Sequence, residues 1–176
     1  MDKTIYLIRH CQATGQEPDA ELTEVGRKQA QELAGFLQKH QVIHFISSPF
    51  TRAIQSIEPA ADQLDLPIEI DDRLAERVLS SEDLPDWMEK LEESFGDIDL
   101  KFAGGESGKE ATARALDVLN EMKDRTAAVT HGNLLGLLLK HMDSNYGFSE
   151  WRKLTNPDVY EVVIKQGTPS VTRIWS

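Results

Sequence analysis

Two histidines and two arginines stand where they could hold and attack a phosphoryl group. Arg9 and His10 follow the apolar run "TIYLI", Arg52 follows "HFISSPFT", and His131 follows "TAAVT". A phosphoryl group carries its charge on three outer oxygens, which several fixed cationic donors can hold. A neutral imidazole can also act as a nucleophile. These residue types therefore fit phosphoryl chemistry, provided that the fold brings the four side chains together.

The position of Arg52 strengthens this interpretation. Arg52 falls in the first turn of a predicted helix, where a cation opposes the helix dipole. An anion bound by both the helix N-terminus and the guanidinium would offset that conflict. Gly132, directly after His131, permits a sharp turn or a close approach of another group to the backbone.

Alternating strand and helix patterns predict how these residues are positioned. Apolar, β-prone segments favour strands at 3–8, 44–48, 67–71 and 125–132, and residues 160–176 are typical of two strands joined by a turn that contains glycine. Helical spacing favours helices within 21–40, 48–64, 85–95, 104–124 and 133–142. Thr23 and Ser48 are candidate N-caps, and Pro59 is expected to end or kink its helix.

This order predicts an α/β fold. We expect three layers, α/β/α, in which helices cover both faces of a mostly parallel sheet with an antiparallel edge strand. No linker or repeat divides residues 1–176, so a single domain is expected. Ligands of open α/β sheets bind beyond the carboxyl ends of the strands. That rule selects the three turns that carry Arg9 and His10, Arg52, and His131.

Composition argues against several classes of partner. The net charge of −11 argues against nucleic acid, which needs a basic surface. No run of about 18 apolar residues occurs, so no membrane partner is expected. Cys11, the single cysteine, cannot form an internal disulfide, and the N-terminus lacks a signal-peptide pattern, which together favour the cytoplasm. No residue cluster has metal-ligand spacing, so neither a metal nor another cofactor is expected.

Six short segments carry a family resemblance. These are "LIRHCQATGQ", "LTEVGRKQA", "SSPFTRAIQS", "RLAER", "GGES" and "VTHGN". In this order they resemble the motifs of the histidine phosphatase superfamily, also called the phosphoglycerate mutase-like family, and most closely its small phosphatase branch. The resemblance runs from the first predicted strand to about residue 135. It implies the phosphoglycerate mutase-like fold over one domain.

The resemblance also implies roles for individual residues. His10 would be the nucleophile that becomes phosphorylated, Glu76 in "RLAER" the proton donor, and His131 the second catalytic histidine. Four residues would contact the phosphoryl group of the substrate: Arg9, Arg52, Gln16 and Asn133. The implied activity is hydrolysis of small phosphorylated metabolites, with release of inorganic phosphate and without a metal ion.

Two positions depart from the family pattern. Cys11 stands where the family has glycine, and we expect a packing variant; the alternative is a redox-sensitive or impaired site. No glycine follows Glu76, so the neighbouring acids Asp71, Asp72 and Glu82 remain alternative proton donors. Trp87 and Trp151 could line a substrate mouth, but core packing is the expected role.

Two other functions remain open. A phosphoglycerate mutase would return the phosphoryl group to a second hydroxyl of glycerate. The family's mutases carry extra basic residues, whereas residues 77–105 here have only Arg77 and Lys90 before "KF", against many acids, which favours the phosphatase. A catalytically impaired module that binds phosphate esters or phosphoproteins is the second alternative, supported by Cys11. The oligomeric state is not predicted.

Overall fold

The computed structural model describes residues 2–176, which form a six-stranded sheet between two layers of helices. The strand order is β3-β2-β4-β1-β5-β6. The strands are β1 (Lys3–Arg9), β2 (His44–Ser47), β3 (Ile68–Ile70), β4 (Thr126–Thr130), β5 (Asp158–Lys165) and β6 (Thr168–Arg173). β3, β2, β4 and β1 are parallel, whereas β5 pairs antiparallel with both β1 and β6. The α/β prediction is confirmed, and the antiparallel part comprises the whole C-terminal hairpin.

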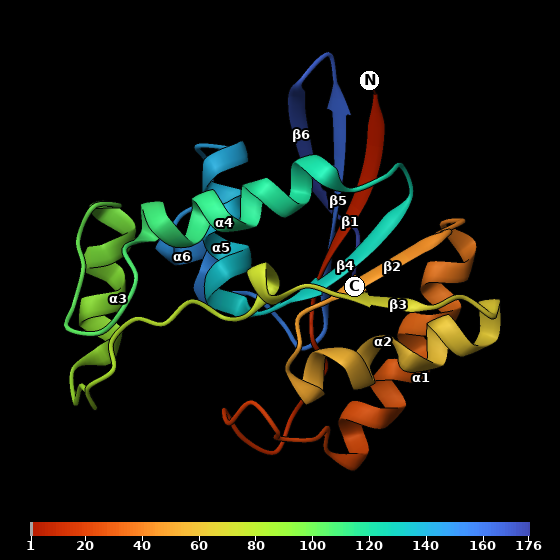
Figure 1. The fold of residues 1–176 in the computed structure, drawn as a ribbon, viewed down its shortest axis with the longest axis horizontal. Coiled ribbons are helices and arrows are strands. Elements are labelled where there is room, and N and C mark those ends of the chain that lie inside the picture. Colours follow the sequence, from red (N-terminus) through yellow and green to blue (C-terminus); the bar gives the residue numbers. More distant parts are fainter. Residues whose placement is uncertain (1) are drawn as a thin grey trace.

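The helices cover the sheet as Figure 1 shows. α1 (Glu24–Lys39) and α2 (Thr51–Leu64) lie on one face. α4 (Gly108–Glu121) and α5 (Gly132–Met142) lie on the other, with α3 (Trp87–Gly96) and α6 (Phe148–Arg152) beside them. A 3-10 turn at Asp72–Leu74 follows β3. This turn and α6 were not predicted, because segments of three and five residues carry too little periodicity.

β1 is buried on both faces, which explains its unbroken apolar run. Ile5 and Leu7 pack with α4 and α5, and Tyr6 and Ile8 pack with α1 and α2. Central parallel strands covered by helices need apolar side chains in both directions.

The predictions for α1 and α2 fared differently. The Thr23 side chain accepts a hydrogen bond from the Gly26 amide at 2.9 Å, so the predicted N-cap of α1 is confirmed. The predicted start of α2 at Ser48 is wrong, and the helix does not end at Pro59. α2 begins at Thr51 and runs through Pro59 to Leu64. Its apolar face continues past Pro59 and packs on α1, and this packing offsets the hydrogen bond that proline cannot donate.

Parallel pairing brings three strand ends to one edge of the sheet. Arg9 at the end of β1 lies opposite Thr130 at the end of β4, and Ser47 at the end of β2 lies opposite Val129. The chain therefore leaves all three strands side by side. Within residues 2–176, no helix combines the length and the apolar character that crossing a membrane requires.

Candidate active site

His10 lies at the carboxyl end of β1 with its ring almost entirely buried. Its Nδ1 is 2.7 Å from the carbonyl oxygen of Cys11, a partner that can only accept, so Nδ1 carries the proton. The lone pair then resides on Nε2, which accepts a hydrogen bond from Nε of Arg52 at 3.3 Å. Burial, together with the charges of Arg52 and Arg9, lowers the pKa of His10 to about 4. His10 is therefore a neutral imidazole near pH 7.

His131 faces His10 from the end of β4. The two ring centroids are 5.1 Å apart. Nε2 of His131 lies 2.8 Å from Oγ of Ser48, while its buried Nδ1 has no hydrogen-bond partner among residues 2–176. Burial lowers the pKa of His131 well below its usual value, and the charges of Arg52 and Arg9 add to this effect. A bound anion would raise the pKa of His131 again. The unpartnered Nδ1 of His131 is therefore suited to contact a phosphoryl oxygen.

Ser48 determines which ring nitrogen of His131 carries the hydrogen. Its Oγ accepts a hydrogen bond from the Phe50 amide at 3.2 Å, which leaves its own O–H to donate to Nε2 of His131. Nδ1 then carries the hydrogen. The sequence analysis assigned Ser48 to a helix cap and missed this contact; a polar residue at the end of a central strand was the available signal.

The two arginines converge on the histidines from different elements. Arg52 projects from the first turn of α2, is buried, and donates Nη1 to the carbonyl oxygens of Gln16 and Glu17 at 3.2 and 2.9 Å. Arg9 donates Nη1 to the Leu154 carbonyl oxygen at 3.0 Å, and its buried Nε is unpartnered among the described residues. A Cβ at Gly132 would lie 3.0 Å from this guanidinium, so the absence of a side chain there gives Arg9 its space.

Glu76 joins this cluster of histidines and arginines from the loop that follows the 3-10 turn. Its Oε2 accepts from the Asn133 amide at 3.0 Å, and its Oε1 accepts from the amides of Leu134 and Arg77 at 2.9 and 2.8 Å. Burial raises the pKa of Glu76, although the three N–H donors and Arg9 oppose the rise. Among the acids considered, Asp71 instead forms an ion pair with Arg73 at 2.7 Å.

The two remaining predicted residues lie at the opening of the site. Gln16 is exposed on the loop after β1 and contributes its backbone carbonyl to Arg52. Asn133 lies in the first turn of α5, and its Oδ1 is buried without a partner within residues 2–176. Because the two ends of an amide are assigned from their partners, Asn133 can present either its oxygen or its NH₂ group to a ligand.

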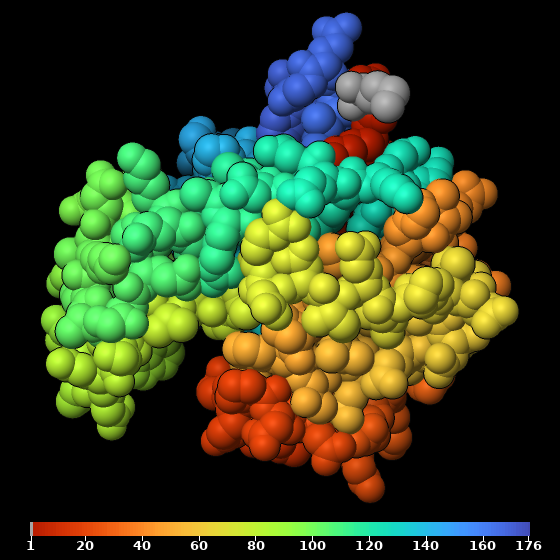
Figure 2. Space-filling view, viewed as in Figure 1, coloured from red at the N-terminus to blue at the C-terminus, as the bar shows by residue number. Residues whose placement is uncertain are grey.

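A cavity of about 500 Å³ adjoins these residues. Figure 2 shows the molecule hollowed between α3 and the loop that follows β1, where this cavity lies. Its polar walls include Arg9, Gln16, Glu76 and Asn133. Its apolar walls are Leu79, Trp87, Leu91 and Trp151. The core-packing role expected for Trp87 is wrong, since this side chain is 49% exposed at the start of α3.

Cys11 turns away from the site. Its side chain is fully buried in the cluster formed with α1 and α2. Its amide donates to Oγ of Ser56 at 2.8 Å, and burial raises the pKa of its thiol to about 11. The thiol is therefore protonated and inaccessible near neutral pH, as a packing residue would be.

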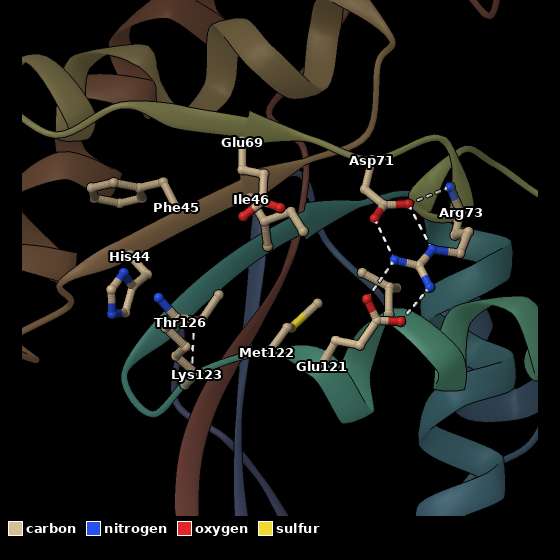
Figure 3. A pocket seen from close by; sticks show the side chains of 11 residues that line it. His44, Phe45, Ile46, Glu69, Asp71, Arg73, Glu121, Met122, Lys123 and Thr126 are labelled. Atoms are coloured by element: carbon tan, nitrogen blue, oxygen red, sulfur yellow. Dashed lines mark hydrogen bonds and ion pairs between the residues drawn. The ribbon is translucent and has the colours of Figure 1, made fainter.

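A second cavity, of about 280 Å³, lies over β2 and β3 next to the end of α4. Figure 3 shows Arg73 there between the carboxylates of Asp71 and Glu121, at 2.7 and 2.6 Å. Both carboxylates therefore engage Arg73, whose guanidinium is not free to hold a ligand. Among residues 2–176, no group of three or more His, Cys, Asp or Glu side chains is placed to hold a metal ion.

Comparison with known proteins identifies the family. The sequence matches the model of the histidine phosphatase superfamily, branch 1, over residues 5–175. The chain therefore belongs to the histidine phosphatase superfamily, and the family and enzyme class predicted from its motifs are confirmed.

Individual relatives are distant. A curated relative, named probable phosphoglycerate mutase GpmB, from Shigella dysenteriae, is 27% identical over 157 residues, which span 77% of this chain and 72% of the relative. A mycobacterial glucosyl-3-phosphoglycerate phosphatase superposes with a TM-score of 0.78 at 22% identity over 99% of both chains. The phosphoserine phosphatase of Entamoeba histolytica, solved as a mutant in complex with phosphoserine, gives a TM-score of 0.76 at 21% identity, covering 97% of this chain and 96% of its own. Both structures share the fold.

Proposed function

We propose that this protein is a metal-independent phosphomonoester hydrolase that acts through a phosphohistidine on His10. The observation that carries the proposal is the state of His10. Its ring is neutral, its proton is held on Nδ1 by the Cys11 carbonyl, and its Nε2 lone pair faces Arg52. A nucleophilic imidazole surrounded by cationic donors suits attack on a dianionic phosphoryl group better than any structural role.

In the first step, Nε2 of His10 attacks phosphorus as the bond to the leaving oxygen breaks. Arg9, Arg52 and Nδ1–H of His131 hold the three outer oxygens, and Asn133 and Gln16 close the opening. Arg52 turns its Nε–H from His10 to the phosphoryl group as the substrate binds. Positioning and charge stabilisation of this kind account for most of the acceleration in phosphoryl transfer.

Glu76 supplies the proton that the leaving alkoxide needs. Oε2 accepts one backbone N–H, whereas Oε1 accepts two, so Oε2 is the oxygen better able to carry the proton. The raised pKa of Glu76 favours this protonated form. After the alcohol leaves, the carboxylate takes a proton from water, which attacks the phosphohistidine and releases inorganic phosphate.

The proposed location of this enzyme is the cytoplasm, because the free thiol of Cys11 suits a reducing compartment.

The cations of residues 77–102 favour hydrolysis over mutase activity. Arg77 is buried and donates to Ser94 and to the Glu106 carbonyl oxygen. Lys90 pairs with Asp86 at 3.4 Å and lies over the ring of Phe102. Lys101 pairs with Glu110 at 3.2 Å. All three cations of this segment are therefore engaged, and none of them is free among the described residues for the carboxylate of a glycerate.

Rapid-quench labelling tests the proposal. Wild type incubated with a ³²P-labelled phosphomonoester is expected to form an acid-labile phosphoprotein, and His10→Gln to form none, with hydrolysis reduced by at least about 10³-fold. His40→Gln, which changes a histidine outside the site, serves as the control. Label that persists in His10→Gln, or ligand binding by wild type without labelling, would contradict the nucleophile; dominant transfer between the hydroxyls of phosphoglycerate would instead indicate the mutase.

A further inference from the structure

The cavity that Arg9 and Glu76 line has two chemically different parts. Arg9, Gln16, Glu76 and Asn133 form the polar part, which the proposed function assigns to the phosphoryl group and proton transfer. The other part has no assigned role. It consists of two leucines and two tryptophans, Leu79, Trp87, Leu91 and Trp151. Because a phosphoryl group cannot use an apolar wall, this wall is available to the alcohol portion of the substrate.

Trp151 is a fixed part of this wall. Its ring stacks on Phe148 with centroids 5.4 Å apart and lies 6.3 Å from the ring of Phe95. A Cβ at Gly136 of α5 would meet the Trp151 ring at 3.0 Å, so the glycine leaves room for the indole. Such packing holds an aromatic surface in place before any ligand arrives, which lowers the entropic cost of binding.

Trp87 is the exposed part of the wall. It begins α3, and its side chain is 49% exposed although it borders the cavity. A ligand ring against this indole would remove apolar surface of both from water, and aromatic pairs gain further from ring geometry.

The charges around the wall disfavour an anionic alcohol. Arg9 is the one cation among the residues described as lining the cavity, and the phosphoryl oxygens occupy it. Asp86 precedes Trp87, and Glu89 follows two residues later on α3. Arg152 and Lys153 follow Trp151 but are not among the residues that line the cavity. A carboxylate at the wall would therefore find no cation lining the cavity other than Arg9, and would be repelled by these acids.

We propose that Leu79, Trp87, Leu91 and Trp151 form a subsite for the leaving group, and that the substrates are phosphate monoesters of uncharged alcohols that carry a ring. This inference rests on the proposed hydrolase function and specifies its substrate class. Trp87 determines specificity by covering the ring, and Trp151 provides the surface beneath it.

Two comparisons of kcat/KM test the subsite: 2-phenylethyl phosphate against ethyl phosphate, and 2-phenylethyl phosphate against 3-phosphoglycerate. 2-Phenylethyl phosphate and ethyl phosphate differ by the ring while keeping an alkoxide leaving group, so a difference in kcat/KM reports recognition of the ring. We expect wild type to prefer 2-phenylethyl phosphate by at least about tenfold over both ethyl phosphate and 3-phosphoglycerate. Trp87→Ala is expected to reduce the phenylethyl-to-ethyl ratio to about two, and Trp87→Phe to retain most of it. Met88→Ala, the adjacent exposed residue that does not line the cavity, is expected to leave the ratio unchanged.

Calorimetric titration separates failure of the subsite from failure of the hydrolase. 3-Phenylpropylphosphonate and propylphosphonate reproduce the two esters with a bond that cannot be hydrolysed. The subsite predicts at least about tenfold tighter binding of the phenyl compound to wild type, and loss of this difference in Trp87→Ala. If binding discriminates but no ester is hydrolysed, the subsite stands and the hydrolase proposal fails. Equal affinities and rates for each pair, or preference for 3-phosphoglycerate, would overturn the subsite even if hydrolysis occurs.

Discussion

At the scale of single residues, the contacts of His10 fit the role of nucleophile that we propose for it. Each ring nitrogen has a different partner: the Cys11 carbonyl holds the proton on Nδ1, and Arg52 faces the lone pair on Nε2. The Asn156 side chain also donates to the His10 carbonyl oxygen at 3.0 Å, which fixes the backbone beneath the ring. The neutral imidazole therefore has one defined tautomer and one defined direction of attack.

Cys11 supplies the backbone carbonyl of this arrangement, whereas its side chain serves the core. Cys11→Ala is expected to lower the free energy of unfolding by about 1 kcal/mol, because a small buried side chain is lost. We expect kcat/KM to stay within about threefold of wild type. Urea unfolding and steady-state kinetics would measure the two effects. A large gain in activity on replacement would indicate that the thiol impairs the site.

A thiol reagent provides the complementary measurement. Because Cys11 is buried and the pKa of its thiol is about 11, folded protein is expected to react slowly and urea-unfolded protein rapidly. Rapid labelling of the folded protein, accompanied by inactivation, would favour the redox-sensitive alternative.

At the scale of elements, the N-terminus of α5 holds Glu76, the proposed proton donor. The amides of Asn133 and Leu134 bind the Glu76 carboxylate, so a helix end and a loop fix each other. The loop in turn is held by α4, since Arg114 donates Nη1 to the carbonyl oxygens of Arg73 and Ala75 at 2.7 and 2.9 Å. Arg114 also pairs with Glu106 at 2.7 Å. These contacts make Arg114 a positioning residue for Glu76.

Arg114→Met tests this positioning role. The loop that carries Glu76 would lose two hydrogen bonds, and kcat/KM is expected to fall by about tenfold or more, because small displacements of catalytic groups are costly. Weaker contacts between Glu76 and the α5 amides would also raise its pKa, which moves the basic limb of the pH–rate profile to higher pH. Arg27→Met, which removes an exposed arginine paired with Glu21, is the control. A lower rate with an unmoved basic limb would argue against the role.

At the scale of the whole molecule, the site concentrates cations within an acidic protein. The chain carries a net charge of −11, yet Arg9, Arg52 and two histidines meet at one sheet edge. Burial favours the neutral form of both histidines, which limits the repulsion among these groups. Binding of a phosphate dianion would supply the missing negative charge and raise the pKa of both rings.

The buried histidines make stability depend on pH. The pKa of His10 falls from 6.5 to about 4 on folding, so between these values the unfolded chain binds a proton that the folded chain does not. The stabilisation from His10 is complete above pH 6.5 and is lost as the pH falls towards 4, a change of about 3 kcal/mol. His131 acts in the same direction, and Glu76, whose pKa is raised, acts in the opposite one.

Urea unfolding between pH 7 and 4 measures this dependence. The free energy of unfolding of wild type is expected to fall more steeply over this range than that of His10→Gln, and the difference between the two slopes isolates His10. Parallel slopes would show that folding does not lower the pKa of His10, and would contradict the effect of burial on this ring.

Residue types and local pattern allowed the central strands and the turns that hold the candidate site to be predicted from the sequence. Apolar runs gave the central strands, because β1 is buried on both faces, and the rule for parallel sheets then selected the turns that hold Arg9, His10, Arg52 and His131. Local signals also identified the cap at Thr23. They failed at Pro59, where packing of α2 on α1 overrides a local breaker.

Tertiary structure alone decided the protonation states and the shape of the site. The tautomers of His10 and His131 depend on the Cys11 carbonyl and on Ser48, and the raised pKa of Glu76 depends on its burial against α5. The apolar wall joins Trp87 of α3 to Trp151 of α6, which lie far apart in the chain and have no shared periodicity. Sequence sets which groups are available, whereas desolvation and long-range contacts, which arise only on folding, set their charge and direction.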